Sequence, residues 1–280
     1  MKIALAIVTL NAASTCNWEE SLSAIDAQTL KPDLLLCADS ESDDATVAHA
    51  LAHGWQALRI ERRTFNHGLT RDFLARTLAE QGFEILILMT QDVVLADACA
   101  LESLIGTLRT TGATAAYGRQ CSRNPLKTLD NWQREQCYPA ESCLKRAADI
   151  PRLGLMTVFC SDAFCAWHLP SLLAQGGFPE AAFGEDTLAA HRALQAGSAI
   201  AYCAQARCFH DHSVTYRALF ARGKAVGQFH ARHRELLRCY GGAGRKGLGF
   251  FRKGLPSLPI LLQLFVKTLG YFHGRFLKGS

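Results

Sequence analysis

Polar and charged residues stand directly after the first four apolar runs of the sequence. They are Thr9 and Asn11 after the first run, Asp39 after the second, Arg71 beyond the third, and Gln91 and Asp92 after the fourth. If these runs are parallel strands, their carboxyl ends meet at one edge of a sheet, where open α/β sheets bind ligands. Carboxylates suit a hard divalent cation, and a guanidinium group suits phosphate. The sequence therefore predicts a polar binding site at that edge.

The alternation of short β-type runs with helical patterns predicts an α/β fold with a mostly parallel sheet. Strands are expected over residues 3–8, 34–38, 56–60, 85–89 and 113–117. Helices are expected near residues 18–29, 44–52, 70–81 and 98–110. Because the strands are apolar without interruption, we expect helices on both faces of the sheet.

The second half of the chain is less regular. Residues 118–155 are polar and contain prolines, which predicts a long loop with short helices. Regular structure is expected again at residues 156–160, near 170–175, over 185–196, at 200–203 and 207–210, and near 216–239. The first of the two longer helices, over 185–196, is expected to end at Gly197.

Composition and short motifs exclude several classes of protein. The 280 residues are 49% apolar and 20% charged, as in an ordinary globular protein. The uninterrupted apolar runs are shorter than the ~18 residues of a membrane-spanning helix. The eleven cysteines form no CxxC pair, which predicts reduced thiols and a cytoplasmic compartment. GxxxxGK[ST] does not occur, which argues against a P-loop ATPase, and the one GxGxxG match, residues 242–247, does not follow a predicted strand, which argues against a dinucleotide-dependent oxidoreductase.

The basic charge is concentrated at the end of the chain. Residues 245–280 contain seven Lys and Arg and no Asp or Glu, whereas the preceding residues carry a net charge of −2. Apolar and aromatic residues between these cations are typical of an amphipathic helix on an anionic membrane surface. A helix docked on the protein's own core, or a dimer contact, is the alternative. A nucleic-acid partner is not indicated, because no RNA-binding or DNA-reading motif is recognisable.

Seven strings of the sequence resemble, in their order, family 2 glycosyltransferases with a GT-A fold, and most closely the bacterial rhamnosyltransferase branch. They are AIVTLN, ADSESDDAT, FNHGLTRDFLA, LILMTQDVVL, YGRQ, GGFPEAAFGEDTLAAHRALQAG and FHDHSVTYRALFARGKAVG. The resemblance implies inverting transfer of a sugar, most closely rhamnose from dTDP-rhamnose. The implied acceptor is a saccharide or lipid-linked saccharide of surface-polysaccharide or lipopolysaccharide (O-antigen) assembly. The enzyme would then be peripheral on the inner face of the cytoplasmic membrane.

The resemblance assigns the polar edge to the nucleotide-sugar donor. Asp39 would accept the N3–H of thymine or uracil, although it could also be a simple turn residue. Asp92 would be the second Asp of the family's DxD motif and would ligate Mg²⁺ or Mn²⁺, although it could also be a helix N-cap. The string Thr90-Gln91-Asp92 lacks the first carboxylate of that motif. Thr9, Asn11, Arg71 and Gln91 would complete the donor site, although Arg71 could also be a solvated surface charge.

A later histidine pair is the other part of the implied metal site. His210 is the favoured ligand and His212 the less favoured one, while a merely structural pair is the alternative. A zinc site formed with Cys203 and Cys208 is disfavoured, because its spacing fits no structural zinc pattern.

On the acceptor side, the resemblance implies Asp186 as the general base that takes the proton of the attacking hydroxyl. An acidic residue in the first turn of a helix is also favoured by the helix dipole alone. Arg119 and Glu185 would lie nearby. The implied domains are residues 1–240, with a nucleotide-binding half over 1–117 and an acceptor half over 118–240, followed by the tail 241–280. The alternatives are a UDP-hexose or UDP-N-acetylhexosamine donor, or a catalytically silent binding module.

Overall fold

The computed structural model describes residues 1–124, 128–211, 215–241 and 257–276. The chain forms two compact units, each built from separate stretches of sequence. The sheet unit comprises residues 1–121, 139–147 and 158–210, and the helical unit comprises residues 122–138, 148–157 and 211–280. Among the described residues, no helix combines the length and apolar content needed to cross a bilayer.

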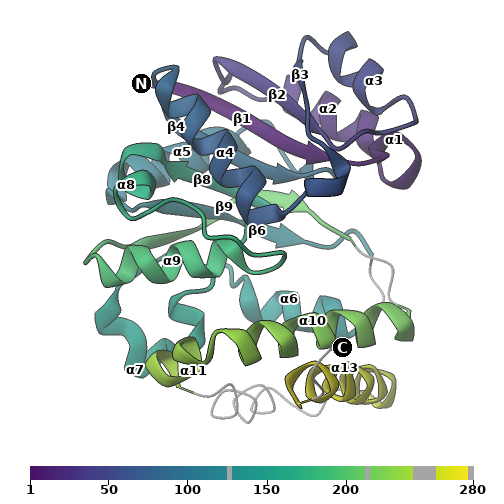
Figure 1. Ribbon diagram of the computed structural model, residues 1–280, viewed down its shortest axis with the longest axis vertical. Helices are drawn as coiled ribbons and strands as arrows, with labels where there is room; N and C mark the ends of the chain where they lie inside the picture. The colour runs from purple at the N-terminus through teal and green to yellow at the C-terminus, as the bar shows by residue number, and fades with distance from the viewer. Residues whose placement is uncertain (125–127, 212–214, 242–256, 277–280) are drawn as a thin grey trace. The chain divides into compact units, whose positions relative to one another are not determined.

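The sheet unit is built on one mixed sheet with the strand order β3-β2-β1-β4-β8-β6-β9-β5, in which β7 also pairs with β9 (Figure 1). The strands are β1 Lys2–Thr9, β2 Leu34–Asp39, β3 Gln56–Arg59, β4 Phe83–Thr90, β5 Val94–Leu95, β6 Ala115–Cys121, β7 Cys143–Lys145, β8 Phe164–His168 and β9 Ile200–Phe209. Strands β1 to β4 are parallel to one another, and β8 runs antiparallel between β4 and β6. The predicted α/β fold is confirmed.

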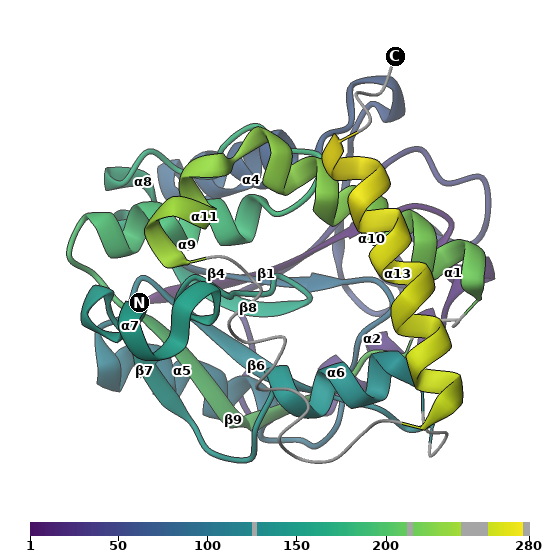
Figure 2. The ribbon, with the colours of Figure 1, turned by 90° about the horizontal axis from the view of Figure 1, so that it is seen from below.

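Helices cover both faces of this sheet, which explains why its strands are apolar on both sides. The helices are α1 Ala12–Thr15, α2 Trp18–Asp26, α3 Thr46–Ala52, α4 His67–Glu80, α5 Ala100–Thr111, α8 Leu169–Ala174 and α9 Glu185–Gln195. Apolar residues of α2, α3 and α5 share one core with alternate residues of β1 and β4, such as Leu5 and Ile87. Helices α4, α8 and α9 pack together on the opposite face (Figure 2).

The helical unit contains α6 Leu129–Cys137, α7 Ile150–Leu153, α10 Tyr216–Arg232, α11 Arg234–Tyr240 and α13 Leu258–Phe276. Helices α6, α10 and α13 share a small core around Leu129, Leu219 and Ile260. Beside it, Arg222 Nη1 lies 2.7 Å from Asp130 Oδ2, which joins α10 to α6.

Three sequence-based expectations for the second half need correction. Residues 156–160 are not a strand: a 3₁₀ helix ends at Thr157, and the strand that enters the sheet is β8. The two short strands expected around Cys203 and Arg207 are one strand, β9, which continues through an irregular register with β6. The long helix expected over 216–239 is divided at His233 into α10 and α11.

Candidate active site

The predicted donor residues lie at one rim of the sheet. The ends of β1, β2 and β4 share this rim because the three strands are parallel. Strand β8 begins at the same rim, since it is antiparallel to β4, and the pairing of β6 with β8 and β9 brings Gln120 and His210 there as well. The backbone N–H of Thr90 donates to Ala163 O at 3.3 Å and ties the end of β4 to the start of β8.

Asp39 is buried at the end of β2 and is held by three hydrogen bonds. Its Oδ1 accepts from Thr9 Oγ1 at 2.8 Å and from Ser42 Oγ at 2.6 Å, and its Oδ2 accepts from Ser42 N at 2.8 Å. A carboxylate offers about four acceptor positions. One position on Oδ2 therefore remains for a donor such as the N3–H of a pyrimidine base, while Thr9 serves to orient Asp39.

Asn11 fixes the loop that follows β1. It adopts a left-handed conformation with φ 49°, and its side-chain oxygen accepts from Asp43 N at 3.0 Å. Its own backbone N–H donates to Ser42 Oγ at 2.7 Å. Asn11 thus joins the loops after β1 and β2 beside Asp39.

Gln91 makes a two-way contact with the backbone of Leu10. Its Oε1 accepts from Leu10 N at 2.8 Å, and its Nε2 donates to Leu10 O at 3.2 Å. The amide therefore acts like a short piece of β-ladder between the loops after β1 and β4. In this geometry Gln91 positions the neighbouring Asp92.

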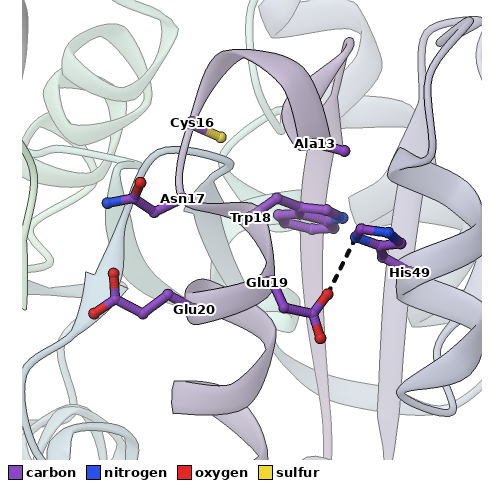
Figure 3. Close-up of a pocket in the computed structure, with 7 residues that line it drawn as sticks. All are labelled: Ala13, Cys16, Asn17, Trp18, Glu19, Glu20 and His49. Atoms are coloured by element: carbon purple, nitrogen blue, oxygen red, sulfur yellow. Dashed lines mark ion pairs between the residues drawn. The ribbon is translucent and has the colours of Figure 1, made fainter.

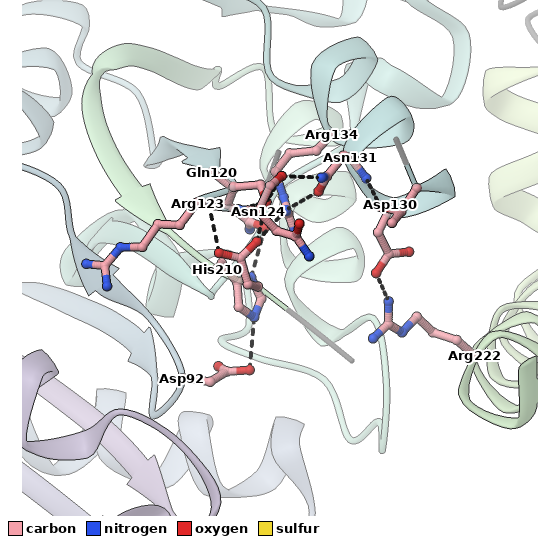
Figure 4. Close-up of polar contacts among 12 residues, drawn as sticks. Asp92, Gln120, Arg123, Asn124, Asp130, Asn131, Arg134, His210 and Arg222 are labelled. Atoms are coloured by element: carbon pink, nitrogen blue, oxygen red, sulfur yellow. Dashed lines mark hydrogen bonds and ion pairs between the residues drawn. The ribbon is translucent and has the colours of Figure 1, made fainter. Parts of the chain in front are cut away.

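Asp92 and His210 face each other across the rim, with Oδ2 and Nε2 3.2 Å apart (Figure 4). The opposite ring nitrogen, His210 Nδ1, lies 2.9 Å from Gln120 Oε1. Gln120 Nε2 donates to Ser161 Oγ at 2.9 Å, which turns its carbonyl oxygen toward the imidazole. Because Nδ1 faces this carbonyl oxygen, it carries a proton, and in the neutral form of the ring Nε2 presents its lone pair toward Asp92.

This arrangement fits a divalent cation bound together with a diphosphate. A carboxylate and an imidazole lone pair that face each other repel unless a proton or a cation lies between them. Within the described ranges, no three His, Cys, Asp or Glu residues gather as a metal-binding group. Mg²⁺ typically takes one or two protein ligands and completes its shell with substrate phosphates and water. His212 lies outside the described residues.

Four charged residues form a second, more deeply buried cluster. Arg71 on α4 is 6% exposed, and its Nη1 contacts Glu185 Oε1 directly and lies 3.4 Å from Asp162 Oδ2. Asp162 N donates to Asp186 Oδ2 at 3.3 Å, and Trp167 Nε1 donates to Asp162 Oδ1 at 2.7 Å. Glu185 and Arg71 thus neutralise each other inside the unit, beside Asp186.

The cluster favours protonation of its aspartates. Burial raises the pKa of Asp162 to about 6, against the opposing effect of the Arg71 charge, and the neighbouring Asp186 raises it further. Burial also raises the pKa of Asp186, again opposed by Arg71. A carboxylate with a raised pKa is a stronger base, so this environment makes Asp186 a better proton acceptor than an ordinary aspartate.

The start of α4 holds the segment that leads into α9. Asn66 caps α4 by accepting from Leu69 N at 3.1 Å, and Gly68 N donates to Ala181 O at 2.9 Å. A Cβ on Gly68 would overlap the backbone of Pro179 and Ala181. The Asn-His-Gly string therefore has a structural reason: it lets the chain before Asp186 lie directly on α4.

Arg119 lies on the other face of the sheet from Gln120, since consecutive strand residues alternate. Its charge acts on Tyr202, whose pKa is raised by burial and is partly lowered again by Arg119. The structure therefore separates Arg119 from the Asp92–His210 pair.

A separate hollow of about 320 Å³ lies beside α2 (Figure 3). Its lining residues are Ala13, Cys16, Asn17, Trp18, Glu19, Glu20 and His49. Glu19 Oε2 lies 3.1 Å from His49 Nδ1 at its edge. The sequence-predicted site residues are not among those that line it.

Gln120 and Asp162 were not expected from the sequence as site residues. Gln120 belongs to the Gly-Arg-Gln string, which was the one available signal. Asp162 lies in Ser161-Asp162-Ala163, just before the strand that the sequence pattern misplaced. Both contribute through hydrogen bonds to residues distant in sequence, which spacing does not reveal.

Comparison with solved structures defines the class of fold. The mannosyltransferase PcManGT from Pyrobaculum calidifontis, in complex with GDP-Man and Mn²⁺, superposes with a TM-score of 0.60 at 16% identity, covering 100% of this chain and 76% of that one. Glucosyl-3-phosphoglycerate synthase from Mycobacterium tuberculosis, with Mn²⁺ and UDP, gives 0.58 at 18% identity and covers 86% and 80%. The fold is that of GT-A glycosyltransferases.

Sequence relatives define the family within that class, although no family model matches the chain. The O-antigen chain rhamnosyltransferase RfbN of Salmonella typhimurium is 37% identical over 287 residues, spanning 98% of this chain and 90% of its own length. The O-antigen chain rhamnosyltransferase WbaN of Salmonella anatum is 34% identical over 273 residues, spanning 94% and 86%. The chain belongs to this family of O-antigen rhamnosyltransferases and is a glycosyltransferase.

Proposed function

We propose that this enzyme transfers rhamnose, with inversion, from dTDP-rhamnose to a saccharide or lipid-linked saccharide of O-antigen assembly. The observation that supports this most is that one unit holds three kinds of group near the sheet rim. They are a buried carboxylate that can accept a hydrogen bond (Asp39), a carboxylate and an imidazole that could bind a metal ion (Asp92 and His210), and a carboxylate of raised pKa (Asp186). The names of the relatives support rhamnose as the sugar and O-antigen as the product.

At the donor end, Asp39 would accept the N3–H of thymine through the free position on Oδ2. Asp92 and His210 would hold Mg²⁺ or Mn²⁺, which, when bound, would neutralise the charge that develops on the departing diphosphate. Gln91 would keep Asp92 in place, and Gln120 would keep the lone pair of His210 turned toward it. Thr9 and Asn11 would orient Asp39 and its loop.

At the acceptor end, Asp186 would take the proton of the attacking hydroxyl as its oxygen bonds to the anomeric carbon and the bond to dTDP breaks. Arg71, which the sequence suggested as a diphosphate contact, would instead act by stabilising Glu185 and Asp162 around this base. Arg119 remains a proposed acceptor contact on the opposite face of the sheet. The domain division at residue 117 and the tail from 241 remain part of the proposal.

The first test is a thermal-shift titration with dTDP, UDP, GDP and CDP, each with and without Mn²⁺ or Mg²⁺. A ligand that binds only the native state raises the melting temperature. We expect a metal-dependent rise with dTDP that is lost in Asp92→Ala and kept in Asp97→Ala, whose surface pair with Arg207 lies outside the ligand pair. No rise with any nucleotide would contradict the donor site and favour a silent module.

The second test separates the donors. Release of dTDP from dTDP-rhamnose, compared with release of UDP from UDP-glucose and UDP-N-acetylglucosamine, would be followed with an O-antigen saccharide acceptor. Faster turnover of a UDP-sugar would contradict dTDP-rhamnose as the donor and support a UDP-hexose or UDP-N-acetylhexosamine donor instead. The anomeric configuration of the product, read by NMR, would decide between inversion and retention.

We also propose a peripheral location on the inner face of the cytoplasmic membrane, where a lipid-linked acceptor would be met. The support is the basic, apolar sequence of the tail, part of which lies outside the described residues.

A further inference from the structure

Helices α10 and α13 pack against each other backbone to backbone. Gly223 and Gly227 on α10 face Gly270 and Gly274 on α13, and all four are buried. A Cβ on any of them would overlap a carbonyl oxygen of the opposite helix. The pair lies side by side in both views (Figures 1 and 2). Small residues four apart on both helices thus fix one face of α13 firmly on the protein.

The opposite face of α13 carries a stripe of large apolar side chains. They are Leu258, Leu262, Phe265, Leu269, Phe272 and Phe276, and each is between 47% and 79% exposed. Their spacing alternates between four and three residues, which places them along one side of the helix. The other exposed positions of α13 are Pro259 and Thr268, so water meets an almost wholly apolar surface.

The buried face of α13 does not explain this stripe. Lys267 is directed inward, where its Nζ donates to Gln133 Oε1 at 2.5 Å and burial lowers its pKa. Arg275 donates to the carbonyl of His230 on α10. The charged side chains Lys267 and Arg275 thus contact other helices of the unit, whereas the large apolar side chains of the stripe point to solvent.

The charge of the helical unit indicates which partner covers the stripe. The described residues of this unit include 11 Lys and Arg against 5 Asp and Glu. Arg217 and Arg232 on α10, and Arg234 and Arg238 on α11, are exposed. An apolar stripe on a unit with excess positive charge complements a surface that is apolar inside and anionic outside, which is the chemistry of an anionic lipid bilayer.

We infer that the outer stripe of α13 lies in the interface of an anionic bilayer, with α10 as its rigid support. The inference rests on the peripheral location proposed above and specifies the surface that makes it. Since no described helix can span a bilayer, α13 would lie in the plane of the membrane. A second copy of the chain is the competing occupant.

The test is co-sedimentation of the full chain with vesicles of phosphatidylcholine alone or with added phosphatidylglycerol. We expect binding to the anionic vesicles, weaker binding at 0.5 M salt, and at least a tenfold loss in Phe265→Ser/Phe272→Ser. The matched control is Leu69→Ser/Phe73→Ser, which removes two similarly exposed apolar residues from α4. Circular dichroism checks that both variants fold.

Three outcomes would overturn the inference: no binding by the wild type, equal binding by the stripe variant, or equal loss in the α4 control. A dimer in light scattering that the stripe variant dissociates, without vesicle binding, would assign the stripe to a second copy. If the membrane inference fails in one of these ways, a metal-dependent thermal shift with dTDP that persists in all these proteins would show that the donor site is nevertheless present.

Discussion

The sheet unit contains 13 Lys and Arg against 20 Asp and Glu, whereas the described part of the helical unit has the opposite excess. Carboxylates of the sheet unit lie near one rim of the sheet. Asp39 is held there by hydrogen bonds, whereas Asp186 belongs to a group of acidic residues around Arg71. In the helical unit, four glycines allow α10 and α13 to pack closely, and a stripe of apolar side chains on α13 remains exposed to solvent. The comparison places the proposed chemistry and the proposed membrane contact on different units, so we expect that each can be altered without the other.

The largest expected effect is on the proposed general base of the sheet unit, Asp186. Asp186→Asn removes the carboxylate proposed to accept the proton, and we expect turnover to fall by about 10²–10⁴-fold while dTDP still raises the melting temperature. Glu180→Gln, an exposed neighbour in the same loop, is the control. A variant that retains more than a tenth of wild-type turnover would remove Asp186 from the role of base.

Next comes the ion cluster around that base. Arg71→Met leaves Glu185 and Asp162 buried without their cation, and we expect the free energy of unfolding to fall by about 3–5 kcal/mol. Arg76→Met on the same helix breaks only an exposed pair with Asp72 and should cost less than about 1 kcal/mol. Urea unfolding measures both; similar costs would contradict the buried cluster.

The packing of α10 against α13 can be tested by comparing Gly227 on α10 with Gly106 on α5. Gly227→Ala forces a Cβ against the backbone of Tyr271 and Arg275, and we expect a loss of about 1–3 kcal/mol. Gly106→Ala on α5 meets open space and should stabilise the chain by about 0.5–1 kcal/mol. Effects of equal sign in thermal unfolding would show that α10 and α13 do not pack at this distance.

A smaller effect is expected at the support of the proposed metal site. Gln120→Met removes the acceptor of His210 Nδ1, and we expect Mn²⁺ affinity in the presence of dTDP to fall about 10–100-fold, measured by the EPR signal of free Mn²⁺. Gln205→Met, an exposed residue of β9, should leave the affinity unchanged. Equal Mn²⁺ affinity in the two variants would mean that Gln120 does not orient His210.

The last expected effect is a pH dependence of stability. Because the folded pKa of Asp162 (about 6) lies above its usual 3.8, the folded state retains a proton that the unfolded state releases. Stability should therefore fall as pH rises from about 4 to 6, by about 2 kcal/mol relative to Asp162→Asn. Urea unfolding at pH 4 and pH 6.5 measures the difference; parallel behaviour of the two proteins would contradict it.

The sequence predicted the first half of the fold well because its signals are local. Apolar runs such as 85–89 are buried on both faces, and the pattern that predicted a helix near 70–81 lies within a single helix, α4. The antiparallel strand β8, Phe164–His168, was missed because the apolar segment 156–160 just before it gives the same local strand signal, and nothing local marks which of the two enters the sheet. The division at His233 was missed because no proline or glycine marks it.

The sequence by itself determined which residue types follow the strands, and its motif order indicated the glycosyltransferase family to which the chain belongs. Tertiary structure alone decided what those residues touch: Gln91 binds the Leu10 backbone, Arg71 pairs with Glu185, and Gln120 directs His210. It also decided that six apolar residues of α13 stay exposed. The reason is physical: strand and helix signals act over a few residues, whereas partners and burial depend on which distant segments pack together.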